Sequence, residues 1–262
     1  MKFWTAAGAA ALSIHGSARA EDVVLRVGDP LTRADLLKPG TQRYLRYLIK
    51  GGHRNPVDLW VRTISFETKD GRRLVRVAQQ WDGVGPEPTV RLEDSLAEAV
   101  TMRPISHERS LTVAGKTKTS AYLFDGGAVR ADPARADNAA AGFSKAAPAP
   151  LYNFVPDVEW FRQLPMRAGR TFVADLYDPG SGEPDRFRFK VDGSDRIAGP
   201  DGHLVDCWLV TTDYNHPEHG LTRYWFAKTN QYMIRQEVDG GERGYLVKIL
   251  LPPEAGDLTE EP

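Results

Sequence analysis

Residues 203–251 decide the fold, and they read HLVDCWLVTTDYNHPEHGLTRYWFAKTNQYMIRQEVDGGERGYLVKILL. Four apolar-rich segments follow one another here, separated only by short loops that contain Gly, Pro, Asn or Asp. Short strands with turn residues at this spacing are typical of an antiparallel meander. Because the apolar face of a sheet must be buried against another element, we expect the meander to close around or against the rest of the chain.

The upstream segments continue this pattern, so the sequence predicts a mainly β protein. Turn signals recur at the spacing expected of about ten to twelve strands. One helix is predicted at residues 156–164, where Asp157 and Glu159 suit the positive end of the helix dipole. We therefore expect a curved antiparallel sheet or half-open β-barrel with one or two short helices.

The first long strand contains a change of alternation. Val57, Leu59 and Val61 share one strand face, whereas Ile64 falls on the other. A β-bulge adds one residue to a strand and reverses the facing of the residues that follow. We therefore predict a bulge or a strong bend near Arg62.

Residues 186–191 show the clearest alternation in the chain. Phe187, Phe189 and Val191 point to one face, and basic residues point to the other. One face of this strand is therefore predicted to be buried and the other to be solvated. We expect the strand to end here, because the Asp-Gly pair at 192–193 is a turn signal.

The N-terminal residues 1–20 are predicted to be a secretory signal peptide. Lys2 precedes a short apolar run, and Ala18 and Ala20 stand at the positions of a cleavage site before Glu21. The run is shorter than the roughly 20 residues that span a bilayer. The alternative is an Ala-rich terminus without export function. We expect the protein to be periplasmic or secreted, with no transmembrane segment.

The remaining chain divides into three predicted parts. Residues 21–40 form a lead-in segment, 41–252 form a single β-rich domain, and 253–262 form an acidic tail. Residues 130–150 are rich in Ala, Pro and charge without apolar periodicity, which predicts a mobile loop inside the domain. Loops of this length act as binding loops or are tolerated surface insertions.

Cysteine content and charge limit the possible classes of protein. Cys207 is the only cysteine, so the chain is not a lipoprotein and forms no internal disulfide. Without Lys2 and Arg19, 32 of the 34 basic residues remain against 35 acidic ones. A net charge of −3 gives no electrostatic reason to expect a nucleic-acid partner.

Residues 213–219 contain the best metal-like cluster. Asp213, His216 and His219 are candidate ligands for zinc or another divalent ion. A polar turn is the preferred interpretation of the same residues, because Pro217 interrupts the segment and no distant ligand pair completes a zinc pattern. The common catalytic motifs are absent, so we predict no catalytic residue and no cofactor.

Aromatic residues gather in the second half of the chain. Most of them are explained by core packing, but a curved sheet with bulky apolar residues and one helix also builds a hydrophobic cavity. Six residues are the candidates for lining such a cavity: Trp160, Phe161, Phe187, Phe189, Trp225 and Phe226.

The final meander also carries a family resemblance. Residues 222–228 (TRYWFAK), 233–237 (MIRQE) and 245–251 (YLVKILL) resemble an uncharacterised group of exported bacterial β-rich proteins. This group is similar in outline to the periplasmic lipoprotein-carrier fold, an incomplete barrel with a helical lid. The resemblance spans residues 44–251 and implies the handling of lipid or lipoprotein by analogy of fold.

Three functional hypotheses follow from the sequence. The first is a non-enzymatic periplasmic binding protein that holds an apolar ligand, such as lipid or a lipoprotein acyl chain. The second is a structural domain of the cell envelope that docks a protein partner through an edge strand or the loop 130–150. The third is an envelope hydrolase or metal-binding protein that uses the loop 213–219.

Overall fold

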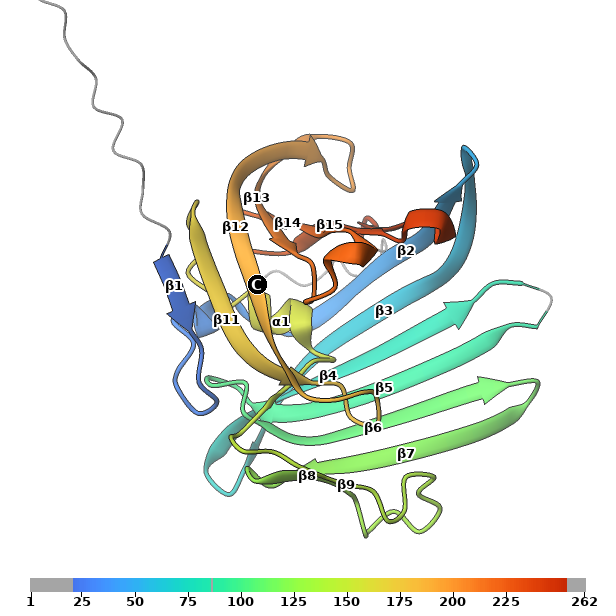
Figure 1. The fold of residues 1–262 in the computed structure, drawn as a ribbon, viewed down its shortest axis with the longest axis vertical. Coiled ribbons are helices and arrows are strands. Elements are labelled where there is room, and N and C mark those ends of the chain that lie inside the picture. Colours follow the sequence, from blue (N-terminus) through green and yellow to red (C-terminus); the bar gives the residue numbers. More distant parts are fainter. Residues whose placement is uncertain (1–20, 86, 254–262) are drawn as a thin grey trace, which may run out of the picture.

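The computed structural model describes residues 21–85 and 87–253. Its strands form one 16-stranded sheet that curls into an incomplete barrel (Figure 1). This confirms the predicted fold class, although the strands are more numerous than the sequence suggests. The predicted signal peptide lies outside the described residues, and so does the predicted acidic tail apart from Pro253.

One wall of the sheet is an antiparallel meander in which each strand pairs with the next along the chain. Its strands are β2 (Gly40–Lys50), β3 (His53–Lys69), β4 (Arg72–Gly83), β5 (Thr89–Glu98), β6 (Pro104–Val113), β7 (Lys116–Phe124), β8 (Ala128–Ala131) and β9 (Ser144–Ala146).

The other wall contains the C-terminal meander, whose four predicted strands are all present as β13 to β16. The strands of this wall are β11 (Arg170–Tyr177), β12 (Asp185–Ala198), β13 (Leu204–Thr212), β14 (Thr222–Ala227), β15 (Met233–Asp239) and β16 (Tyr245–Leu250). The last strand, β16, pairs with β2 in antiparallel register and so joins the two walls into one sheet.

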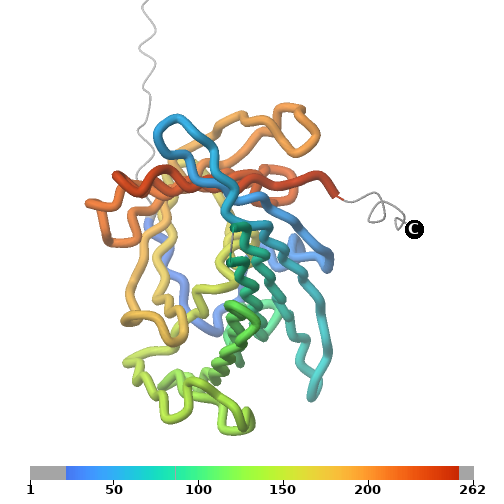
Figure 2. The backbone as a smooth tube through the Cα atoms, turned by 90° about the vertical axis from the view of Figure 1, so that its right-hand side faces the viewer, coloured from blue at the N-terminus to red at the C-terminus, as the bar shows by residue number. Residues whose placement is uncertain are grey.

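Two short strands, β1 (Glu21–Val24) and β10 (Tyr152–Asn153), pair with β11 in parallel. The predicted lead-in segment therefore begins with a strand of the sheet. The β2–β3 and β12–β13 turns project at one end of the molecule, and the loop after β8 lies at the opposite end (Figures 1 and 2).

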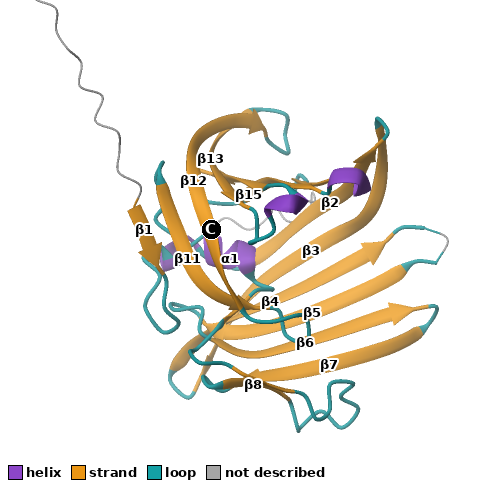
Figure 3. Ribbon diagram, in the orientation of Figure 1, coloured by secondary structure: helices purple, strands orange, loops and turns teal. Residues whose placement is uncertain are grey.

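Helical structure is short, and α1 (Asp157–Phe161) lies inside the curve of the sheet (Figure 3). It falls within the predicted helix and begins with the two acidic residues expected there. The 3-10 segments are η1 (Ala34–Leu36), η2 (Pro217–His219) and η3 (Gly241–Arg243). Over residues 21–85 and 87–253, no helix has the length and the apolar character to cross a bilayer.

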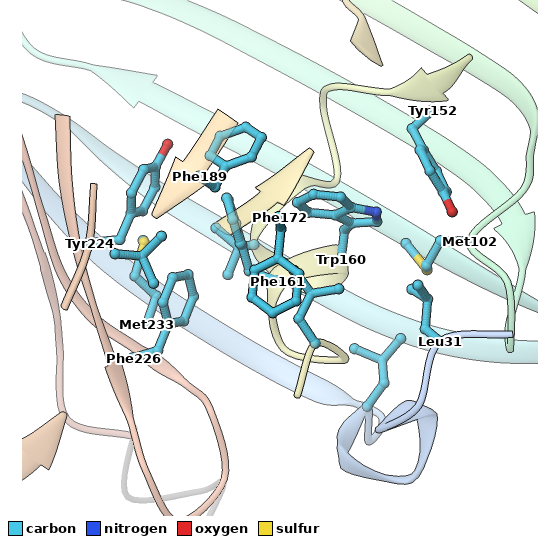
Figure 4. Close-up of a cluster of buried hydrophobic side chains, with 14 of the residues drawn as sticks. Leu31, Met102, Tyr152, Trp160, Phe161, Phe172, Phe189, Tyr224, Phe226 and Met233 are labelled. Carbon is cyan, nitrogen blue, oxygen red and sulfur yellow. The ribbon is translucent and has the colours of Figure 1, made fainter. Parts of the chain in front are cut away.

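The main core forms where α1 meets the inner face of the sheet. Phe161 of α1 contacts Phe189, Tyr224 and Phe226, with ring centroids 4.8 to 5.3 Å apart (Figure 4). Trp160, also of α1, contacts Phe189 with the ring centroids 5.6 Å apart. Edge-to-face and tilted ring pairs of this kind add to the stabilisation that burial provides.

The bulge predicted near Arg62 is absent; the register of β3 shifts only against β2, at Val57. In β3 the buried residues Asp58, Trp60, Arg62 and Ile64 alternate without a break, so Arg62 points to the core. The register of β3 against β4 is also continuous. The apparent phase change arose because a charged residue occupies an inner position, while apolar residues such as Val61 lie on the outer face.

The strand that was predicted to end at Val191 continues as β12 to Ala198. Its register against β13 shifts between Val191 and Gly193, which marks a β-bulge at Asp192. The Asp-Gly pair therefore bends a long strand instead of ending it. Beyond the bulge, β12 curls over the end of the sheet (Figure 1).

Residues 130–150 contain the end of β8 and the whole of β9. The buried Asn138 side chain accepts from the Ala121 backbone N–H and donates to the Ala121 carbonyl, at 3.0 and 2.8 Å. These bonds fasten the segment to β7. Its mobility stays a prediction.

Candidate functional site

The candidate site lies on the inner face of the sheet, the face against which α1 packs. Strand pairing arranges the side chains there in rows across β14, β15, β16 and β2. The outer row consists of Thr222, Val238, Leu246 and Leu48. The next row inward consists of Tyr224, Gln236, Lys248 and Arg46. Residues two apart along a strand are about 7 Å apart, so a mostly apolar row borders a polar row directly.

The outer row lines a cavity of about 360 Å³, called the Leu246 cavity below. Leu48, Val238 and Leu246 provide its apolar wall. Its polar rim includes Asp213, His216 and His219 from the segment before β14, Asp239 at the end of β15, and Arg243 of η3. An apolar wall with a few polar groups is the usual composition of a small-molecule site.

A second cavity, of about 430 Å³, is called the Phe187 cavity below. Phe154, Phe187 and Tyr214 form its aromatic wall, with ring centroids 5.5 to 6.1 Å apart. The rim of this cavity includes three carboxylates and one imidazole, from Asp178, Glu183, Asp185 and His216. The Phe187 cavity therefore combines an aromatic wall with an acidic rim.

Tyr214 and His216 line both cavities, so the loop that carries them separates the two. Tyr214 and Asn215 adopt left-handed backbone conformations with φ of 51° and 61°. The Asn215 amide donates to the Asp185 carboxylate at 2.8 Å, which fastens the loop to β12. The Tyr214 and Tyr224 hydroxyls are hydrogen-bonded to each other, and burial raises the pKa of both.

Lys248 is the cation at the centre of the polar row. Its ammonium lies 4.7 Å from the ring centroid of Trp60, which is a cation–π contact. Burial, followed by the nearby Arg46 guanidinium, lowers the pKa of Lys248 to about 7. Among the described residues, Lys248 has neither a hydrogen-bond acceptor nor an ion-pair partner.

The other two cations beside Lys248 are paired with carboxylates. Arg46 of β2 donates from two guanidinium nitrogens to the carboxylate of Asp58 on the neighbouring strand β3. Arg62 donates from Nε to Glu159 Oε1 at 2.9 Å and from a second nitrogen to the other carboxylate oxygen. Arg62 also lies 3.8 Å from Asp157, so α1 is held to the inner face by buried charge pairs as well as apolar contacts.

The structure separates the six predicted lining residues into three groups. Trp160, Phe161, Phe189 and Phe226 lie together in the packed core and are at most 2 % exposed. Phe187 is partly buried and forms the wall of a cavity. Trp225 belongs to a separate cluster with Cys207 and Ile234 on the other face of β14.

Of the three predicted metal ligands, His216 and His219 lie close together and Asp213 does not. Single ligand atoms of His216, Glu218 and His219 lie within 4.8 Å of one another, and all three residues are exposed. Asp213 is not part of this group, and Glu218 replaces it. The backbone N–H of Glu218 and the His216 side chain lower the pKa of the Glu218 carboxyl.

Two further reactive residues are buried. Nδ1 of His107 lies 3.1 Å from Ser95 Oγ, and burial lowers the pKa of His107 to about 3. Glu108 points to the opposite face and pairs with Arg135. Cys207 is fully buried, and burial raises the pKa of its thiol to about 11. Neither arrangement presents an activated nucleophile to solvent.

Sequence reasoning missed Lys248 and Arg62 as members of the site. Both lie in strand segments where apolar residues occupy both faces, such as the YLVKIL run of β16. Such a run has no alternation of polar and apolar residues, so the sequence does not predict to which face of the sheet its single charged residue points. The partners that decide the facing come from β2 and α1, far away in the sequence.

The fold and the cavities define a β-barrel-like protein with two adjacent cavities on its inner face. The chain belongs to a family described as protein of unknown function DUF3108, whose family model matches residues 47–248. No curated protein matches the sequence.

The fold also resembles that of a solved structure. It is the crystal structure of a β-barrel-like protein of the domain of unknown function DUF1849 from Brucella abortus. The TM-score is 0.52 at 10 % sequence identity, with 82 % of this chain and 96 % of that chain covered. This likeness supports the barrel-like fold of the sheet.

Proposed function

We propose that the protein is an exported, non-enzymatic binding protein that holds an apolar ligand, such as a lipid or a lipoprotein acyl chain. The observation that carries the proposal is the pair of cavities on either side of Tyr214. One offers the aromatic wall around Phe187, and the other offers the aliphatic wall around Leu246. Each has a volume within the range of about 300 to 1,000 Å³ that is usual for small-molecule sites.

Two features of the sequence support the compartment and the class of ligand. The predicted signal peptide at residues 1–20 supports export to the periplasm or beyond. The resemblance to the periplasmic lipoprotein-carrier fold supports an apolar cargo. An acyl chain gains about 0.8 kcal/mol for each methylene that leaves water, so a few buried methylenes give useful affinity.

The test is to look for bound lipid in protein purified from a periplasmic extract. Native mass spectrometry and lipid extraction should show a co-purifying apolar species at a fixed ratio to the protein. Leu246→Asp places a charge in the wall of the Leu246 cavity and should remove part or all of this species. Leu204→Asp is the matched control, because Leu204 is 60 % exposed and outside both cavities.

The alternative is an envelope domain that docks a protein partner through residues 130–150 or an edge strand. It predicts that the purified protein carries no lipid and that deletion of this segment abolishes capture of the partner. Co-purified lipid that is lost in Leu246→Asp but retained without the segment 130–150 would favour the carrier function.

The second candidate function is metal binding by His216, Glu218 and His219. The closeness of their three ligand atoms favours it. Zinc titrated into the mature protein should release heat that a His216→Ala/His219→Ala variant lacks. Identical heats for the two proteins would end this hypothesis.

A further inference from the structure

We propose that the ligand is a single-chain amphiphile with an anionic headgroup, which Lys248 binds while the chain occupies the Leu246 cavity. The inference rests on the proposed function as a carrier of apolar ligands. It adds the charge of the headgroup, the residue that recognises it and the cavity that takes the chain.

The first argument is the pairing of charges around Trp60. Asp58 is bound to Arg46, and Glu159 is bound to Arg62. Lys248 is the remaining cation of this group, and within residues 21–85 and 87–253 no carboxylate lies within ion-pair distance of it. Asp157 is the remaining carboxylate. It lies 3.8 Å from Arg62, and its charge also acts on Lys248, but from beyond ion-pair distance. An added anion would therefore find its complement at Lys248.

The second argument is the supply of hydrogen-bond donors. An ammonium carries three donors, and a partly buried one is costly unless acceptors surround it. Gln236 pairs with Lys248 across the strands, is only 4 % exposed, and its amide makes no hydrogen bond to another described residue. A carboxylate placed between these two side chains accepts from both, and the bond to the ammonium is charge-assisted.

The third argument is the distance between head and chain. Leu246 precedes Lys248 by two residues on the same face of β16, and Leu48 and Arg46 are related in the same way on β2. The backbone positions of Leu246 and Leu48, which line the Leu246 cavity, therefore lie one step along the strands, about 7 Å, from those of Lys248 and Arg46. An anion at Lys248 has its attached chain directed along the aliphatic row.

The Phe187 cavity is a poorer place for the same ligand. Asp178, Glu183 and Asp185 lie on its rim, and an anionic headgroup there would be repelled by like charge. The rim of the Leu246 cavity also carries two carboxylates, Asp213 and Asp239, but it adds the Arg243 guanidinium, and Lys248 lies in the neighbouring row. Lys248 selects the Leu246 cavity for an anionic amphiphile.

The experiment compares three amphiphiles of equal chain length: decanoate, decanol and decyltrimethylammonium. Their affinities for the lipid-free protein are measured by displacement of a neutral fluorescent probe at pH 6.5. Lys248→Met keeps an aliphatic stem over Trp60 and removes the charge, and Lys248→Arg keeps the charge. Lys118→Met, an exposed lysine on β7, is the matched control, and urea unfolding verifies that each variant is folded.

We expect wild type to bind decanoate about tenfold more tightly than decanol, the ratio that one charge-assisted hydrogen bond provides. Lys248→Met should lose this preference and keep decanol affinity, whereas Lys248→Arg and Lys118→Met should keep the preference. Equal binding of decanoate and decanol by wild type, or a preference that survives in Lys248→Met, overturns the inference and leaves the carrier function intact. Failure of all three amphiphiles to bind overturns the carrier function itself.

Discussion

Arg62 of β3 and Glu159 of α1 form a fully buried ion pair, with Nε 2.9 Å from Oε1 and side-chain exposures of 1 % and 0 %. A buried pair of this kind is costly to split, because the remaining charge has no partner and no water. Since the pair joins α1 to the wall of the sheet, we infer that it holds the helix in place inside the barrel.

We predict that Glu159→Leu and Arg62→Met each lower the free energy of unfolding by about 3 to 5 kcal/mol. The double variant Arg62→Met/Glu159→Leu should lose much less than the sum, because neither charge is then left alone in the core. Urea unfolding of the four proteins measures the coupling. Additive losses would show that the pair does not act as a unit.

How far the sequence predicts the fold depends on how local the signal is. The C-terminal meander is encoded by apolar segments and turn residues next to one another, and its four strands form as expected. The facing of Arg62 depends on Glu159, which is 97 residues away. No periodic pattern within β3 contains that information, so the change of alternation was interpreted as a bulge.

The candidate site shows the same limit. Alternation correctly puts Phe187 and Phe189 on one face of β12, but it does not distinguish a cavity wall from the core. That distinction depends on which part of the strand α1 covers. Phe189 lies under Phe161, whereas Phe187 lies beyond the helix beside Phe154 and Tyr214.

This difference leads to a prediction about the two phenylalanines. Phe189→Ala should destabilise the protein by about 3 to 5 kcal/mol, as expected for a ring removed from a packed core. Phe187→Ala should cost less stability, because its ring is only partly buried, and should weaken binding of the neutral dye Nile red to the Phe187 cavity. Urea unfolding and dye titration of both variants provide the comparison. A larger loss of stability in Phe187→Ala would contradict the assignment of Phe187 to a cavity wall.

The hydroxyl pair of Tyr214 and Tyr224 gives a further prediction. Tyr224 is fully buried, and its hydroxyl has no other hydrogen-bond partner among the described residues. Tyr214→Phe should therefore lower the free energy of unfolding by about 1 to 3 kcal/mol, the cost of leaving a buried hydroxyl unpaired. The double variant Tyr214→Phe/Tyr224→Phe should be no less stable than the single one. A double variant that loses twice as much would show that the two hydroxyls contribute independently.

The last prediction concerns pH and the anionic ligand. The charged groups that face Lys248 come from three elements: Arg46 on β2, Asp58 and Arg62 on β3, and Asp157 on α1. Burial and the two guanidiniums lower the pKa of Lys248 to about 7, so the folded protein loses this positive charge as the pH rises through that value. Burial raises the pKa of the Asp157 carboxyl. As the pH rises, this carboxyl loses its proton and becomes negative, which also weakens the binding of an anion.

Both effects make binding of decanoate strongest below pH 7 and weaker above it. Once Lys248 is neutral in the free protein, each further pH unit lowers the affinity by up to about tenfold, until the pKa of Lys248 in the complex is reached. Displacement titrations from pH 6.5 to pH 9 should show this fall for decanoate and not for decanol. In Lys248→Met the decanoate curve should lose most of its slope, because the group that exchanges the proton is gone. An unchanged slope in Lys248→Met would assign the pH dependence to another group and remove Lys248 from headgroup binding.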